Sequence, residues 1–206
     1  MTNTFKFELE EKSTSKIIEF FDQTKKILIL TGDPRKYHYL SKNNEFSLEI
    51  PILIHDNVES IDAYLSNKNN LEIITKKQNY DIIVLDQILE FLSDPSMFLK
   101  NISGFLSSNG IIVGCINNFS NILNRIKFLD GELDKEKLSS TTIFSLEDIL
   151  LSLSNSNLKM TKLDRIEKQI SKSNQIELKN YVLPLELLNS INDDSESQTF
   201  FYVFTA

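Results

Sequence analysis

Two patterns of apolar residues alternate along the first part of the chain. Short aliphatic runs bounded by turn residues predict buried strands, and apolar residues spaced three and four apart predict helices between them. The expected strands are 25–30, 49–54, 71–74, 81–85 and 110–116. The expected helices are 13–26, 34–41, 56–65 and 95–106. Strands that alternate with helices in this way indicate an α/β fold with a mostly parallel sheet.

The last third of the chain has a different pattern. A helix is expected over 119–129, a polar loop over 130–142, and a helix over 145–153, with Ser145 and Asp148 in the positions of a capping box. The runs 158–166 and 199–205 predict two strands that form an antiparallel hairpin at the edge of the sheet. We therefore expect one domain over 1–206, with 1–24 as a helical lead-in and seven strands in all.

Composition narrows the function classes. Of 206 residues, 41% are apolar and 25% are charged, as in ordinary globular proteins. The chain has one cysteine and two histidines, so we do not expect a metal site built from these residues. The net charge of −7 argues against nucleic-acid and anionic-membrane partners. The sequence has no 18-residue apolar run and no apolar leader, so a cytoplasmic location without membrane contact is expected.

The segment 80–95 carries a resemblance to a known family. It reads Tyr-Asp, four aliphatic residues, Asp-Gln-Ile, Leu-Glu-Phe-Leu and Ser-Asp-Pro. This resembles the fourth-strand region of class I S-adenosylmethionine (SAM)-dependent methyltransferases, which typically shows aromatic-Asp, an aliphatic strand, and Leu-Glu-His followed by Asp-Pro. Further similarities follow in order at 106–110, 116–118 and 142–146. The resemblance implies a Rossmann-like seven-stranded sandwich with an antiparallel C-terminal strand, SAM as cofactor, and methyl transfer.

The turn after the first strand departs from that family. There the strand ends in an acid and a Gly-x-Gly-x-Gly turn, whereas this chain has Thr31, Gly32, Asp33 and Pro34. Glycines let a ligand approach the backbone closely, and proline removes a backbone donor. The resemblance assigns Gly32 and Asp33 to the cofactor. The alternative is that Gly-Asp-Pro is an ordinary turn in which Asp33 caps the next helix.

Three further residues are candidates for holding the cofactor. Asp56 follows the second expected strand, where the family's acid grips the ribose hydroxyls; the alternative is a helix cap with Glu59 as the partner in a capping box. Asp86 and Gln87 leave the fourth expected strand at its carboxyl end, where parallel sheets bind ligands. We expect this pair to line the pocket.

The acceptor side is less well defined. By resemblance, Asn117, Asn118 and Arg125 face the substrate, and 130–142 is a candidate lid. Phe91 replaces a frequent histidine and so removes a general base, and the stretch around it is equally explained by packing. No catalytic residue can be named from the sequence.

Two functions therefore remain open. The first is SAM-dependent methylation of a small molecule or glycan, which needs few catalytic residues because it depends on holding two groups at attack distance. The second is a pseudoenzyme, a methyltransferase fold kept as a binding or assembly module without SAM. Gly-x-Gly-x-x-Gly, phosphate-loop and Gly-x-Ser-x-Gly motifs are absent from the sequence, which disfavours dinucleotide enzymes, NTPases and that class of hydrolase.

Overall fold

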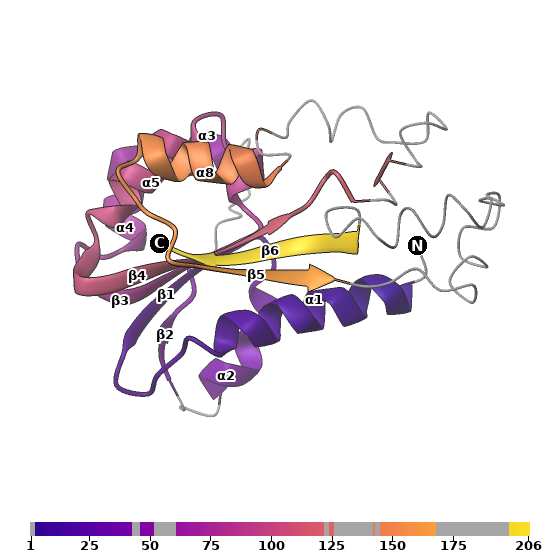
Figure 1. The fold of residues 1–206 in the computed structure, drawn as a ribbon. Helices are drawn as coiled ribbons and strands as arrows, with labels where there is room; N and C mark the ends of the chain where they lie inside the picture. The colour runs from indigo at the N-terminus through magenta and orange to yellow at the C-terminus, as the bar shows by residue number, and fades with distance from the viewer. Residues whose placement is uncertain are drawn as a thin grey trace, which may run out of the picture.

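A computed structural model describes residues 3–42, 46–51, 61–121, 124–125, 142, 145–167 and 198–206. A sheet with helices on both faces forms its centre (Figure 1). The described strands are β1 (Lys26–Thr31), β2 (Ser47–Glu49), β3 (Tyr80–Asp86), β4 (Leu106–Asn117), β5 (Lys162–Glu167) and β6 (Thr199–Thr205). They lie in the order β2-β1-β3-β4-β6-β5.

The strand directions confirm the predicted fold class. β2, β1, β3 and β4 are parallel, β6 runs antiparallel to β4, and β5 runs antiparallel to β6. The terminal strand thus lies beside β4, which is the expected fifth strand, and β1 lies inside the sheet. The described residues form six strands where seven were expected.

The missing strand is a helix. The expected strand 71–74 belongs to α4 (Lys68–Ile74), whose N-cap Asn67 accepts a hydrogen bond from the Asn69 backbone N–H at 2.9 Å. Leu71 and Ile74 are buried, one helical turn apart, whereas Ile73 is 68% exposed. The prediction was wrong because the four-residue segment Leu-Glu-Ile-Ile is too short to distinguish helical from strand periodicity.

Several boundaries also differ from the predictions. The first helix, α1, spans Asn3–Ile18 and not 13–26, because Leu9 and Ile17 form its buried stripe. β2 begins at Ser47, two residues before the expected strand, and 52–60 lie outside the described residues. The expected strand 110–116 is longer, because β4 begins at Leu106. Tyr80 pairs with Leu106 and Ile82 with Ile111, so 107–110 form an irregular excursion.

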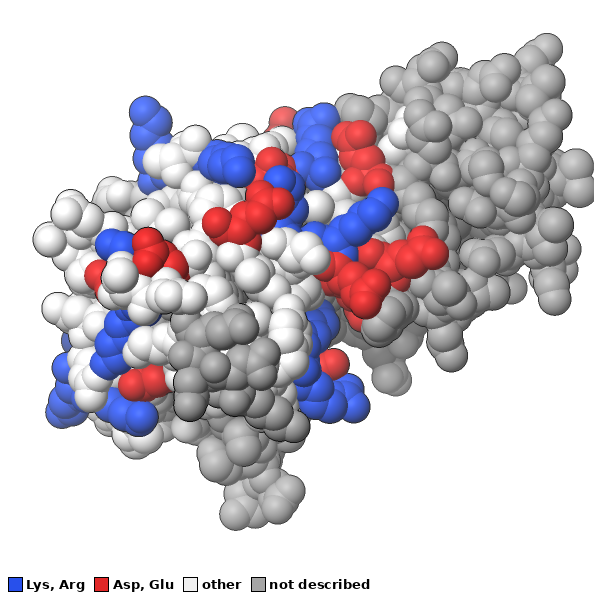
Figure 2. All heavy atoms as spheres, turned by 90° about the horizontal axis from the view of Figure 1, so that it is seen from below, with Lys and Arg blue, Asp and Glu red and all other residues white. Residues whose placement is uncertain are grey.

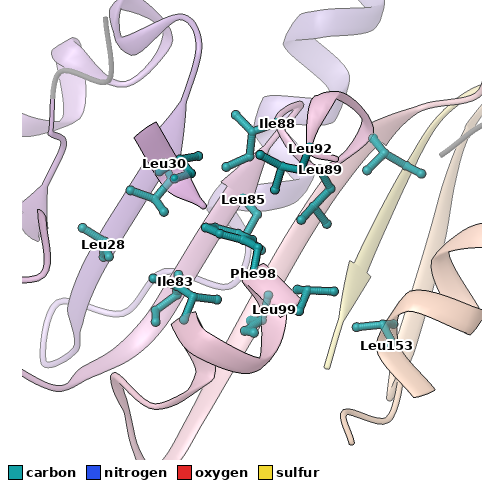
Figure 3. Close-up of a cluster of buried hydrophobic side chains, with 14 of the residues drawn as sticks. Leu28, Leu30, Ile83, Leu85, Ile88, Leu89, Leu92, Phe98, Leu99 and Leu153 are labelled. Atoms are coloured by element: carbon teal, nitrogen blue, oxygen red, sulfur yellow. The ribbon is translucent and has the colours of Figure 1, made fainter. Parts of the chain in front are cut away.

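Two hydrophobic layers hold the sheet. On one face lie α1 and α2 (His38–Lys42); on the other lie α3 (Ile61–Leu65), α4, α5 (Pro95–Ser103) and α8 (Leu146–Asn155) (Figure 1). The layer under α5 and α8 packs leucine, isoleucine and phenylalanine side chains from β1, β3 and these helices (Figure 3). The predicted capping box of α8 is present: Ser145 Oγ accepts from the Asp148 N–H, and Asp148 accepts from the Ser145 N–H at 2.9 Å. These layers fix the carboxyl ends of β1, β3 and β4.

Candidate functional site

Asp86 is the central polar residue at the carboxyl edge of the sheet. It ends β3 directly opposite Thr31, the last residue of β1, and its side chain is only 1% exposed. The Thr31 hydroxyl donates a hydrogen bond to Asp86 Oδ2 at 3.2 Å and accepts one from the Asp33 backbone N–H at 3.1 Å. The turn after β1 is thereby joined to the end of β3.

A lysine from that turn reaches the same carboxylate. Lys36 closes the short 3-10 helix η1 (Pro34–Lys36), and its Nζ lies 3.4 Å from Asp86 Oδ2. The Lys36 side chain is 16% exposed, so the ion pair is largely withdrawn from water. A buried carboxylate needs such a partner, because an unpaired charge in the interior costs several kcal/mol, on the order of 3–5.

Asp33 has the role of a turn and capping residue. Its Oδ1 accepts from the backbone N–H of Arg35 at 3.2 Å, and both carboxylate oxygens pair with the Arg35 guanidinium, at 2.7 and 3.1 Å. The Arg35 guanidinium is the main reason why the pKa of Asp33 lies below its usual range. These contacts match the turn-and-cap alternative, and the assignment of Asp33 to a cofactor stays a prediction.

Gly32 lies next to open space. A Cβ built on Gly32 would meet no atom within 4 Å, so neither packing nor a left-handed backbone requires glycine there. The free space adjoins the carboxyl end of β1, one residue from Thr31 and its hydrogen bond to Asp86. A ligand can therefore approach the backbone at this point.

Gln87 and Asn117 continue the polar edge toward β4. Gln87 has a φ of 55°, a left-handed conformation that costs a non-glycine residue about 1 kcal/mol. Its backbone N–H donates to the Cys115 carbonyl at 2.8 Å, and its side-chain oxygen accepts from Asn117 Nδ2 at 3.4 Å. Lys76, Lys77 and Asn157 have the same left-handed conformation, so the backbone of Gln87 does not by itself mark a functional site.

Glu90 is the site residue that sequence reasoning missed. It lies in η2 (Leu89–Phe91), is fully buried, and its Oε1 accepts from Asn117 Nδ2 at 2.6 Å and from the Asn117 backbone N–H at 3.3 Å. Oε2 is buried without a hydrogen-bond partner among the described residues. Burial first, with a smaller contribution from the charge of Asp86, raises the pKa of Glu90 to about 7. A lone acid in the run Ile-Leu-Glu-Phe-Leu was the available signal.

The predicted acceptor-side residues differ in their burial and in their contacts. Asn118 is fully buried; its amide donates to the Thr199 carbonyl at 2.9 Å and its oxygen accepts from the Ser120 N–H, which ties β4 to β6. Arg125 is exposed, and its backbone N–H bonds the Asn121 carbonyl. Asp56 and the candidate lid 130–142, apart from Thr142, lie outside the described residues.

Tyr37 and Cys115, near the edge, belong to the core. Tyr37 is fully buried against the sheet, whereas Tyr39 is 53% exposed. Burial first, and then the charge of Asp86, raises the pKa of the Tyr37 hydroxyl. Cys115 is buried, and burial raises the pKa of its thiol, which makes it an unreactive core residue.

A groove of about 640 Å³ runs between α1 and the turn after β1. Its lining residues are Glu10, Glu11, Thr14, Ser15, Asp33, Arg35, Lys36 and Tyr39. On the face of the molecule that carries α1, acidic and basic side chains are interspersed, and the described residues show no continuous basic patch there (Figure 2). Within the described ranges no helix is long and apolar enough to cross a bilayer, and no group of side chains is arranged for a metal ion.

Comparison with known proteins identifies the fold. No protein-family model matches the sequence, and no curated protein matches it either. Among solved structures, a SAM-dependent methyltransferase from Archaeoglobus fulgidus aligns with a TM-score of 0.62 at 14% identity, over 97% of this chain and 93% of that one.

Two further structures show the range of proteins with this fold. Geranyl diphosphate C-methyltransferase from Streptomyces coelicolor, in complex with Mg²⁺, geranyl diphosphate and S-adenosylhomocysteine, aligns with a TM-score of 0.51 at 11% identity over 97% of this chain and 77% of that one. The [4+2]-cyclase SpnF aligns with a TM-score of 0.53 at 10% identity over 95% and 80%. The chain therefore has the Rossmann-like fold of class I SAM-dependent methyltransferases.

Proposed function

We propose that this chain binds SAM at the carboxyl ends of β1 and β3 and methylates a small molecule or a glycan. The observation that carries the proposal is the pairing of open space at Gly32 with the buried carboxylate of Asp86, on adjacent strands. Ligands of open parallel sheets bind at this edge.

The chemistry of the residues present fits the cofactor. SAM carries a primary ammonium at its amino-acid end, and a buried carboxylate is a strong acceptor for such a group. Asp86 would hold that ammonium, and the space beside Gly32 would admit the ligand close to the backbone. Asp56 keeps its predicted role at the ribose hydroxyls.

The role of the protein in this reaction is to position the methyl acceptor relative to the cofactor. When bound, SAM supplies an electrophilic methyl group on a sulfonium sulfur. Glu90 and Asn117 hold the end of β4 against η2, and the Thr142 N–H and hydroxyl bond the Glu90 and Leu92 carbonyls, so the acceptor side is fixed to the same edge. Holding acceptor and methyl group at attack distance supplies most of the rate enhancement such a reaction needs. The net charge of −7 favours a small or uncharged acceptor over nucleic acid.

A specific observation also favours the second function, a non-catalytic module. Lys36 already pairs with Asp86, Arg35 pairs with Asp33, and Pro34 has no N–H for a ligand. SpnF, whose structure aligns with this chain, is described as a cyclase, so the fold alone does not define methyl transfer.

Calorimetric titration with SAM and with S-adenosylhomocysteine separates the two functions. We expect micromolar binding to the natural chain, about −8 kcal/mol. Asp86→Asn should weaken it roughly ten- to a hundredfold, because a charge-assisted hydrogen bond contributes about 1.5–3 kcal/mol. The matched control is Asp94→Asn at the N-cap of α5, which should leave affinity unchanged. No binding at millimolar ligand would support the non-catalytic module.

A further inference from the structure

The Lys36–Asp86 ion pair links two elements at the carboxyl edge of the sheet. It lies at the edge where a ligand is proposed to bind, and it joins the turn after β1 to the last residue of β3. The lysine therefore occupies the carboxylate that the proposed function needs for the ligand.

The geometry of the pair indicates a weak contact, in which another ammonium could replace that of Lys36. Strong charge-assisted bonds from an ammonium to a carboxylate are about 2.7–2.9 Å long, whereas Nζ of Lys36 lies 3.4 Å from Oδ2 of Asp86. The same oxygen also accepts from Thr31 at 3.2 Å, and Oδ1 accepts from Gln87 Nε2 at the long distance of 3.5 Å. The carboxylate thus has capacity for a better placed ammonium.

The Lys36 side chain also has a second position open to it, in the groove beside α1. Lys36 lines the groove between α1 and the turn, and its side chain is 16% exposed, whereas that of Asp86 is 1% exposed. Rotation about the side-chain bonds would carry Nζ from Asp86 into the groove, which also contains Glu10, Glu11 and Asp33. Arg35 also lines the groove and already pairs with Asp33, so Glu10 and Glu11 are the acids that make a positive charge favourable there.

We propose that Lys36 is an internal competitor, whose ammonium holds Asp86 until a ligand bearing a primary ammonium displaces it. This rests on the proposed function, because the ligand class is the amino-acid end of SAM and of S-adenosylhomocysteine. The lysine compensates the buried charge when no ligand is bound and lowers apparent affinity, since a ligand must first displace it.

Two probes and one substitution test this. Lys36→Met removes the ammonium and keeps the length of the side chain. S-adenosylhomocysteine carries the amino-acid end, whereas 5′-methylthioadenosine keeps the adenosine and sulfur without it. In calorimetric titrations, Lys36→Met should bind S-adenosylhomocysteine about tenfold more tightly than the natural chain, and 5′-methylthioadenosine equally well. Lys100→Met is the matched control, because Lys100 is an exposed lysine in the last turn of α5, away from this edge, and the substitution should change neither affinity.

The outcomes separate this proposal from the proposed function. If the natural chain binds S-adenosylhomocysteine and Lys36→Met binds it equally or more weakly, the competitor role is wrong and the function stands. If neither protein binds at millimolar concentration, the function fails and the competitor role fails with it.

A second measurement tests the proposal if Lys36→Met does not fold. Lys36→Ala leaves Asp86 without its cation, so ethylammonium chloride should raise its melting temperature by about 3 °C or more relative to sodium chloride at equal ionic strength. The natural chain and the double variant Lys36→Ala with Asp86→Asn should show no such difference. Equal melting temperatures in both salts for Lys36→Ala would contradict an exchangeable ammonium site.

Discussion

At the scale of single residues, Glu90 is the clearest case of a group whose ionisation the fold controls. Its carboxyl is fully buried, one oxygen accepts from Asn117, and the other has no partner among the described residues. The pKa is raised from 4.5 to about 7, mainly by burial. The folded protein therefore takes up a proton here at a higher pH than the unfolded chain.

This shift predicts a pH-dependent stability. The contribution of Glu90 is fully present below its unfolded pKa near 4.5 and is lost as the pH rises through about 7, with a total of about 3 kcal/mol. Glu90→Gln cannot ionise and should therefore lose less stability than the natural chain between pH 5 and 8. Urea unfolding at both pH values measures this difference, and Glu147→Gln, at an exposed helix position, is the control. An unchanged pH dependence in Glu90→Gln would show that Glu90 ionises normally.

At the scale of elements, the junction between β4 and β6 depends on a glycine. A Cβ at Gly114 would overlap the ring of Phe204, which faces it across the strand pair. Gly114→Ala should therefore cost about 1–3 kcal/mol of unfolding free energy, as overpacking does in a dense core. Gly32→Ala adds the same group into open space and should change stability by less than about 0.5 kcal/mol. Thermal and urea unfolding of the two variants make the comparison, and equal losses would contradict it.

Most elements could be predicted because their apolar pattern is long or because a second signal, such as a helix cap, supports it. β3 and β6 are continuous apolar runs, and α8 has both a capping box and an apolar stripe. The run 71–74 was misread because the cap at Asn67 is a local signal outside the apolar run itself. The excursion at 107–110 could not be predicted, since register depends on the partner strand.

At the scale of the whole molecule, the sequence predicted where the candidate residues lie on the sheet but not which residues they contact. Asp86 and Gln87 lie at the expected edge, because the carboxyl ends of parallel strands meet there. The pairing of Lys36 with Asp86 joins residues 50 positions apart, and only the fold brings them together. The buried role of Glu90 likewise depends on Asn117, which lies 27 residues away.

The central claim is that a SAM-like ligand binds where β1 and β3 end. Nuclear magnetic resonance of the isotope-labelled chain, titrated with S-adenosylhomocysteine, tests it most directly because each backbone N–H reports its own surroundings. We predict saturable shifts at micromolar ligand for the amides of Gly32, Asp86 and Gln87, with Leu163 in β5 unchanged. An unchanged spectrum at millimolar ligand, or shifts confined to residues away from this edge, would contradict the claim.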